Sequence, residues 1–208
     1  MTKNETPPIP AVLAPRTVFR SIPTRIRDLR ETMVPPLVIE PAAEQSQAAV
    51  RQALRELGSK LAEIHRNAAE AYLSQSDYEG ALPHLEAAVT FGPGEPELRM
   101  QLGFVRYLTG SDGGAIDAFN AVLMADGNNY EAWFNLGMVL FGQKQHAEAE
   151  DCFRRSTEIH PDDAQTWNNR GVCLWKTQRI ADAKVCFQKA LQIDPNDADA
   201  AFNLSCVR

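Results

Sequence analysis

Long apolar runs and paired cysteine motifs are both missing from this sequence. No stretch of 18 consecutive apolar residues occurs, so a membrane-spanning helix is not expected. The N-terminus has no basic segment followed by an apolar core, so no secretory signal is predicted. The four cysteines form no CxxC motif and lie in apolar periodic stretches, which indicates reduced thiols in a cytosol-like compartment. We therefore expect a cytoplasmic protein.

Motifs of catalysis and metal binding are lacking too. The patterns GxxxxGK[ST], GxSxG and HExxH do not occur. The four histidines show neither i,i+4 pairing nor a nearby cysteine ligand, which argues against a zinc site. The run DPNDAD at 194–199 lacks the glycine and the distal glutamate of a calcium loop, so it is interpreted as a turn with a helix cap. The sequence thus predicts no enzymatic activity, no metal and no cofactor.

Positive charge is scarce in most of the chain. The net charge is −6, and residues 1–42 carry six basic and four acidic side chains against fifteen and twenty-three in the remainder. Binding nucleic acid requires a cationic surface that displaces counterions from phosphates. Nucleic acid is therefore excluded as an expected partner.

Residues 1–42 hold eight of the thirteen prolines, which prevent a continuous helix or strand ladder. We predict a Pro-rich, Arg-containing, disordered leader. Five arginines between Arg16 and Arg30 are mixed with apolar residues. The leader is interpreted as a solvated linker, with one alternative: a short recognition segment that folds on a partner or on this protein's own acidic body.

The stretch Tyr130–Asp163 is repeated 34 residues later as Ala164–Asp197. A fixed period of this length indicates an array of repeats. The period extends backwards to two weaker units, 62–95 and 96–129. Within each unit, the apolar spacing predicts two helices that are separated by a short turn.

The two ends of the array have their own predictions. Apolar residues at alternating spacings of four and three from Val50 onwards predict an N-terminal capping helix over 43–61. Gly58 leaves open one long helix into the first unit or two helices broken near Ser59. Residues 198–208 are predicted as a terminal or truncated capping helix. Its apolar side is expected to support self-association, and hence a possible homo-oligomer, through Phe202, Leu204 and Val207.

The repeated residues resemble the tetratricopeptide repeat family, whose pattern W-x2-L-G-x2-Y, A-x3-F, P has this period. In the third unit the matching residues are Trp133, Leu136, Gly137, Ala149, Phe153 and Pro161. The fourth unit departs from the pattern at Arg170, which stands in place of leucine. The resemblance implies an all-α fold, a right-handed α-solenoid of tandem helix–turn–helix repeats. Two further expectations are that Gly103, Gly137 and Gly171 let the paired helices approach, with alanine opposite, and that Pro83 delays or kinks its helix.

The resemblance also implies that the first helices line a concave groove. Carboxamides recur at the sixth position of each first helix, where they could pair with the backbone of an extended ligand: Asn67, Gln101, Asn135, Asn169 and Asn203. Apolar and aromatic candidates at neighbouring positions are Phe104, Tyr107, Phe134, Met138, Phe141 and Trp175. A clamp for acidic C-terminal peptides is not expected, because Arg66 is the only cation at the fifth positions and Glu131 stands where such a clamp needs a base.

Three functions follow from these observations. The first is a non-enzymatic interaction scaffold or chaperone-like adaptor that binds a peptide or a partner helix in the groove. The second is the substrate-recruiting part of a larger enzyme or of a secretion or assembly machine. The third is a structural protein that assembles with itself through its ends.

Overall fold

The computed structural model describes residues 41–92 and 94–207. The chain divides into two compact segments, 1–48 and 49–208. The described part of 1–48 is the opening of one helix, and the features below belong to 49–208. The predicted leader, 1–42, lies almost wholly outside the described residues, so its interpretation stays a prediction.

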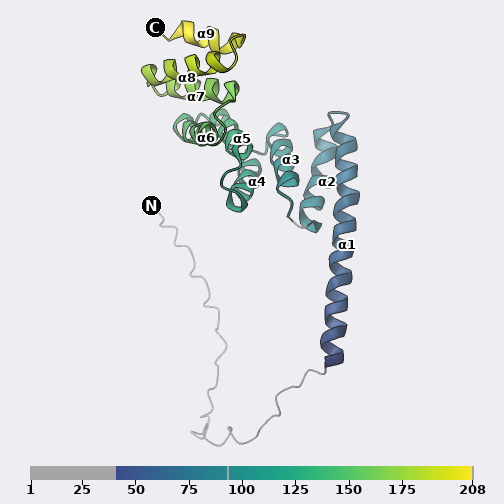
Figure 1. The fold of residues 1–208 in the computed structure, drawn as a ribbon. Coiled ribbons are helices and arrows are strands. Elements are labelled where there is room, and N and C mark those ends of the chain that lie inside the picture. Colours follow the sequence, from purple (N-terminus) through teal and green to yellow (C-terminus); the bar gives the residue numbers. More distant parts are fainter. Residues whose placement is uncertain (1–40, 93, 208) are drawn as a thin grey trace, which may run out of the picture. The chain divides into compact units, whose positions relative to one another are not determined.

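The described residues form nine helices and no strand, in the order shown in Figure 1. Their bounds are α1 Pro41–Leu73, α2 Tyr78–Phe91, α3 Pro96–Leu108, α4 Asp112–Ala125, α5 Tyr130–Gly142, α6 His146–Ile159, α7 Ala164–Lys176, α8 Ile180–Ile193 and α9 Ala198–Cys206. From α2 onwards each helix packs on the next one along the chain. The pairs α3–α4, α5–α6 and α7–α8 lie within residues 96–129, 130–163 and 164–197.

Helix α1 settles the question that Gly58 left open. It runs without a break for 33 residues, so the predicted capping helix and the first helix of unit one form a single continuous helix. Helix α2 begins at Tyr78, 34 residues before α4, and contains Pro83. The late start that Pro83 suggested does not occur, because α2 begins at Tyr78, before Pro83; the alternative, a kink, stays a prediction.

Short polar side chains begin the first helices of the later units. Asn129, Asp163 and Asp197 each accept hydrogen bonds from backbone amides in the first turn of α5, α7 and α9. The indoles of Trp133 and Trp167 then donate to the carbonyls of Gly127 and Pro161, at 2.9 and 2.8 Å. Each tryptophan therefore ties its helix to the preceding turn.

The turn inside each unit has the same backbone conformation. Its left-handed residue is Ser76, Gly110, Lys144 or Gln178, with φ between 58° and 78° and an exposed side chain. These positions are 34 residues apart. Only one of the four is glycine, the residue that adopts this conformation without steric cost. Packing of the flanking helices, rather than the local residue, therefore sets the turn.

The repeated glycines face phenylalanine rings. A Cβ added at Gly103, Gly137 or Gly171 would lie 2.6 to 2.8 Å from an edge atom of Phe119, Phe153 or Phe187. The nearest atoms to these glycines belong to the buried aromatic ring of the second helix, and the expectation that alanine lies opposite stays a prediction.

Unit one has a different pair of residues at the positions of this glycine and phenylalanine. Ala69 stands at the glycine position and Leu85 at the phenylalanine position, and both are buried in one core cluster. The smaller leucine leaves room for the methyl group that phenylalanine excludes. The two pairs are thus alternative fillings of one space.

A second repeated contact joins neighbouring units. The seventh residue of one first helix packs in the same core cluster as a residue of the preceding second helix, as Leu102 with Leu82 and Leu136 with Ile116. Between units three and four this apolar pair becomes Arg170 with Glu150, whose side chains are 19% and 9% exposed. Arg170 Nε donates to Glu150 Oε1 at 2.8 Å.

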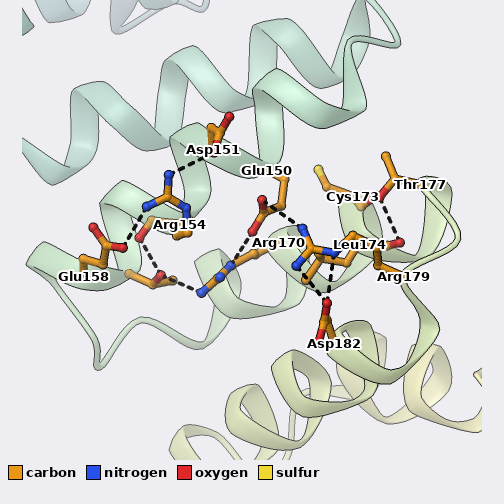
Figure 2. Close-up of polar contacts among 11 residues, drawn as sticks. Glu150, Asp151, Arg154, Glu158, Arg170, Cys173, Leu174, Thr177, Arg179 and Asp182 are labelled. Carbon is orange, nitrogen blue, oxygen red and sulfur yellow. Dashed lines mark hydrogen bonds and ion pairs between the residues drawn. The ribbon is translucent and has the colours of Figure 1, made fainter.

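Figure 2 shows that Glu150 lies between two arginines. Its second carboxylate oxygen is 3.7 Å from Arg179, which also pairs with Asp182 at 2.8 Å. The Arg170 guanidinium further lies 3.5 Å from the Thr157 hydroxyl and 5.5 Å from the centre of the Trp167 ring. Charge and hydrogen bonds thus replace the apolar contact that joins the earlier units.

Three of the four thiols are buried and should be unreactive. Burial raises the pKa of Cys152 and Cys173 to about 12 and that of Cys186 to about 11, whereas Cys206 is exposed. At pH 8 we expect a maleimide to label only Cys206 in the folded chain and all four thiols in urea. Mass spectrometry of the labelled peptides identifies the modified residues.

The same pKa shifts determine how the free energy of unfolding changes with pH. The folded state binds the thiol protons more tightly than the unfolded state, whose thiols titrate near 9. The stability from these three groups is complete below pH 9 and is lost as the pH rises towards 11 to 12. Fast labelling of Cys152 or Cys186 at pH 8 would contradict the burial on which this expectation rests.

Candidate peptide-binding groove

The candidate groove follows the first helices. Contacts between α3 and α5, and between α7 and α9, bring these helices together directly. Equivalent side chains of consecutive units therefore recur along one face, at the second, fifth, sixth, ninth and twelfth positions of each helix. Two hollows lie on this face between α5 and α7.

The first, which we name the acidic hollow, has a volume of about 400 Å³. Its lining comes from α5, from the α6–α7 turn and from the start of α7: Tyr130, Glu131, Phe134, Asn135, His160, Asp162, Asp163 and Gln165. The Tyr130 ring packs edge-on against His160, with centroids 4.5 Å apart. The Tyr130 hydroxyl donates to Glu131, which raises the pKa of Tyr130.

The second, which we name the apolar hollow, is smaller, about 210 Å³, and more enclosed. It is lined by Met138, Phe141, Phe153, Asn169 and Val172. Phe153 comes from α6 and lies at the bottom of this hollow, where it is 1% exposed and belongs to the core. Asn169 is the polar group at this hollow, and its amide nitrogen lies 3.5 Å from the Met138 sulfur. Such a site suits one apolar side chain beside a backbone amide.

The carboxamide ladder is not uniform. Asn135 and Asn169 each reach a hollow, one acidic and one apolar. Asn203 donates to the Asn168 side chain at 2.9 Å, so part of its hydrogen-bonding capacity is used within the chain. Asn67 is exposed on α1 and Gln101 is half-buried. Neither lines the two hollows.

The aromatic candidates divide in the same way. Phe134, Met138 and Phe141 are half-buried, pack on the core of unit three and line the hollows. Phe104 is 47% exposed on α3. Tyr107 and Trp175 pack against the cores of their own units and lie away from both hollows. The best-formed part of the groove therefore belongs to units three and four.

The predicted self-association surface is smaller than expected. Phe202 is 67% exposed, but Val207 is only 3% exposed and packs with Leu174 and Phe187. Leu204 is half-buried against the same cluster. Val207 therefore completes the core of unit four, and self-association through these three residues stays a prediction.

Two features were missed from the sequence. His65 of α1 and His84 of α2 lie with their Nδ1 atoms 3.0 Å apart, between the rings of Phe91 and Tyr72. The search for histidines four residues apart on one helix could not find a pair that spans two helices. At least one ring of the pair must be neutral, since one nitrogen has to accept.

The second missed feature is an apolar stripe on α1. Val50, Leu54, Leu57 and Ile64 are each more than half exposed. Leu54 and Gly58 also line a hollow of about 540 Å³ together with Phe91. Their regular spacing was visible in the sequence, where it predicted a capping helix over 43–61.

Neither a metal centre nor a membrane span is found in the part of the chain that the structure describes. There, no three His, Cys, Asp or Glu side chains are grouped so that they could hold a metal ion. None of the helices within 41–92 and 94–207 combines the length and the apolar character that crossing a bilayer needs.

The geometry defines an array of antiparallel helix pairs with a lined inner face. Family models described as tetratricopeptide repeat match residues 130–163, 164–197 and 43–96, which together exceed half of the chain. The chain belongs to the tetratricopeptide repeat family, and the predicted all-α solenoid is confirmed. No curated protein matches its sequence.

Solved structures with a similar fold include the following three proteins. MamA from Desulfovibrio magneticus RS-1 is 24% identical, with a TM-score of 0.67 over 71% of this chain and 83% of that one. YrrB, described as a repeat protein with an unusual peptide-binding site, is 26% identical, with a TM-score of 0.64 over 76% and 84%. The first repeat domain of Spaghetti (RPAP3), bound to the HSP90 peptide SRMEEVD, is 21% identical, with a TM-score of 0.53 over 56% and 92%.

Proposed function

We propose that this protein is a non-enzymatic interaction scaffold that binds an extended peptide or a partner helix along its first helices. Tetratricopeptide repeat proteins are in general interaction modules, and the structural neighbours include peptide-binding members. A chaperone-like adaptor role is the finer form of this proposal. The cytoplasmic location stays a prediction.

One observation carries the proposal. The acidic and apolar hollows lie next to each other on α5 and α7, each with one asparagine of the ladder. The asparagines can pair with a ligand backbone, while the hollows receive side chains of two different kinds. A purely structural inner face needs no hollows that carboxamides line.

The proposed ligand differs from the HSP90 peptide in the RPAP3 complex. That peptide is acidic, and the groove positions of this chain lack the basic residues that would receive its carboxylates. Arg66, the single cation at a fifth position, already pairs with Glu95 at 2.6 Å. A clamp for acidic C-termini is therefore not part of the proposal.

The scaffold function can be tested with an Asn135→Ala/Asn169→Ala variant. Each lost hydrogen bond contributes about 1 kcal/mol, so affinity for a groove ligand should fall about 30-fold. A pull-down with mass spectrometry, repeated with and without residues 1–42, identifies partners, and calorimetry with a recovered partner measures the change. The matched control is Asn120→Ala/Gln188→Ala, which removes two exposed carboxamides from second helices.

A second candidate function, self-assembly, is favoured by the exposure of Phe202 and of the α1 stripe. The same experiment separates the two. If Asn135→Ala/Asn169→Ala leaves partner recovery unchanged while Phe202→Asp abolishes it, the groove proposal is overturned and self-assembly is supported.

A further inference from the structure

We infer that the groove selects segments that carry arginine or lysine close to a bulky apolar side chain. The inference rests on the proposed function and names the chemistry of its ligand. It combines the acidic hollow, the apolar hollow and the absence of bases from the inner positions of α3, α5, α7 and α9.

Among the residues that the structure describes, the carboxylates of the acidic hollow are not neutralised. Among residues 45–92 and 94–207, no basic side chain forms an ion pair with Glu131, Asp162 or Asp163. Glu131 and Asp162 are exposed, whereas Asp163 also caps α7. Two carboxylates are therefore open to a ligand. An arginine offers them several donors in a fixed fork, and a lysine offers three.

The aromatic rings of the hollow favour the same ligand. Tyr130 and Phe134 line it beside the carboxylates, and Tyr130 is held in place by His160. A cation over the face of an aromatic ring gains electrostatic attraction in addition to its ion pair. The long methylene stem of arginine or lysine can also pack on these rings. A small cation without such a stem would use only part of the site.

The rest of the inner face keeps the same sign of charge. The second positions of α3 and α9 carry Glu97 and Asp199, as α5 carries Glu131. No lysine or arginine occurs at the second, fifth, sixth or ninth position of α3, α5, α7 or α9. Anionic partners, including acidic peptides and nucleic acid, would meet uncompensated repulsion there.

The apolar hollow sets the second requirement. Phe134 at the acidic hollow and Met138 at the apolar hollow are one helical turn apart on α5, a rise of about 6 Å. An extended ligand covers this distance in about two residues, at ~3.3 Å per residue. The cationic and apolar side chains of the ligand should therefore be near neighbours in its sequence.

The test is an unbiased selection. The full chain is immobilised and used to select binders from a random library of 12-residue peptides displayed on phage. We expect enrichment of arginine or lysine within about four residues of leucine, isoleucine, phenylalanine or methionine. A selected peptide should bind about three- to tenfold more weakly to Glu131→Gln/Asp162→Asn, and the loss should shrink as salt is raised.

The control variant removes the same charge elsewhere. Asp117→Asn/Glu148→Gln changes two exposed carboxylates on the second helices and should leave binding unchanged. Enrichment of acidic peptides, or equal losses in both variants, would overturn the inference while leaving a groove in place. If the selected peptides instead ignore Asn135→Ala/Asn169→Ala, the proposed function itself fails.

Discussion

A Glu150→Leu variant should unfold about 2 to 3 kcal/mol more readily than the natural chain, although leucine is the more apolar residue. The change leaves Arg170 in the interface between units three and four without its 2.8 Å partner. Arg170→Leu should be destabilising for the converse reason, because Glu150 is only 9% exposed. Urea unfolding, followed by tryptophan fluorescence, measures both effects.

The double variant Glu150→Leu/Arg170→Leu should recover most of the lost stability and end within about 1 kcal/mol of the natural chain, or above it. The pairs Leu82 with Leu102 and Ile116 with Leu136 show that this space accepts two apolar side chains. The coupling energy of the double-mutant cycle isolates the contact. Additive losses in the two single variants would show that the pair does not act as a unit.

Gly171→Ala has the second large expected effect. Alanine is the better helix former by about 1 kcal/mol, yet its methyl group would lie 2.6 Å from Cε1 of Phe187. The ring is fully buried and cannot yield, so we expect a net loss of about 2 kcal/mol. Thermal and urea unfolding monitored by circular dichroism at 222 nm provide the measurement.

Two further variants make this expectation specific. Gly113→Ala, in a helix where the added methyl group meets nothing within 4 Å, should raise stability by about 0.5 to 1 kcal/mol. Gly171→Ala/Phe187→Leu reproduces the natural Ala69–Leu85 pair and should recover part of the loss. If the double variant is no better than Gly171→Ala, steric contact with the ring is not the cause.

The repeat period made most of the fold predictable. Trp133, Gly137 and Phe153 recur at a fixed spacing, and each has a packing reason that the structure displays. The bounds of α5 to α8 follow the predicted units closely. What periodicity could not provide was the identity of each contact, such as the phenylalanine ring that faces each of these glycines.

Departures from the repeat were harder to interpret. Arg170 was visible as a residue out of pattern, but its partner Glu150 lies 20 residues away on another helix. The His65–His84 pair is likewise formed across two helices. Such contacts depend on the packing of one helix on another, which a pattern along one helix does not encode.

The candidate groove was partly predictable. Five residues named from the sequence line the two hollows: Phe134, Asn135, Met138, Phe141 and Asn169. The acidic hollow also needs His160 and Asp162 from a turn, which no helix position indicates.

The left-handed turns at Ser76, Gly110, Lys144 and Gln178 are also suitable positions for attaching fluorescent labels. All four positions are exposed at the tip of a helix pair and recur with the period of the array. A fluorophore pair attached at two of them, after removal of the exposed thiol of Cys206, would report distances between successive units. Because these positions are exposed, the labels should not disturb the core, and the distance between them could be followed while a ligand is added.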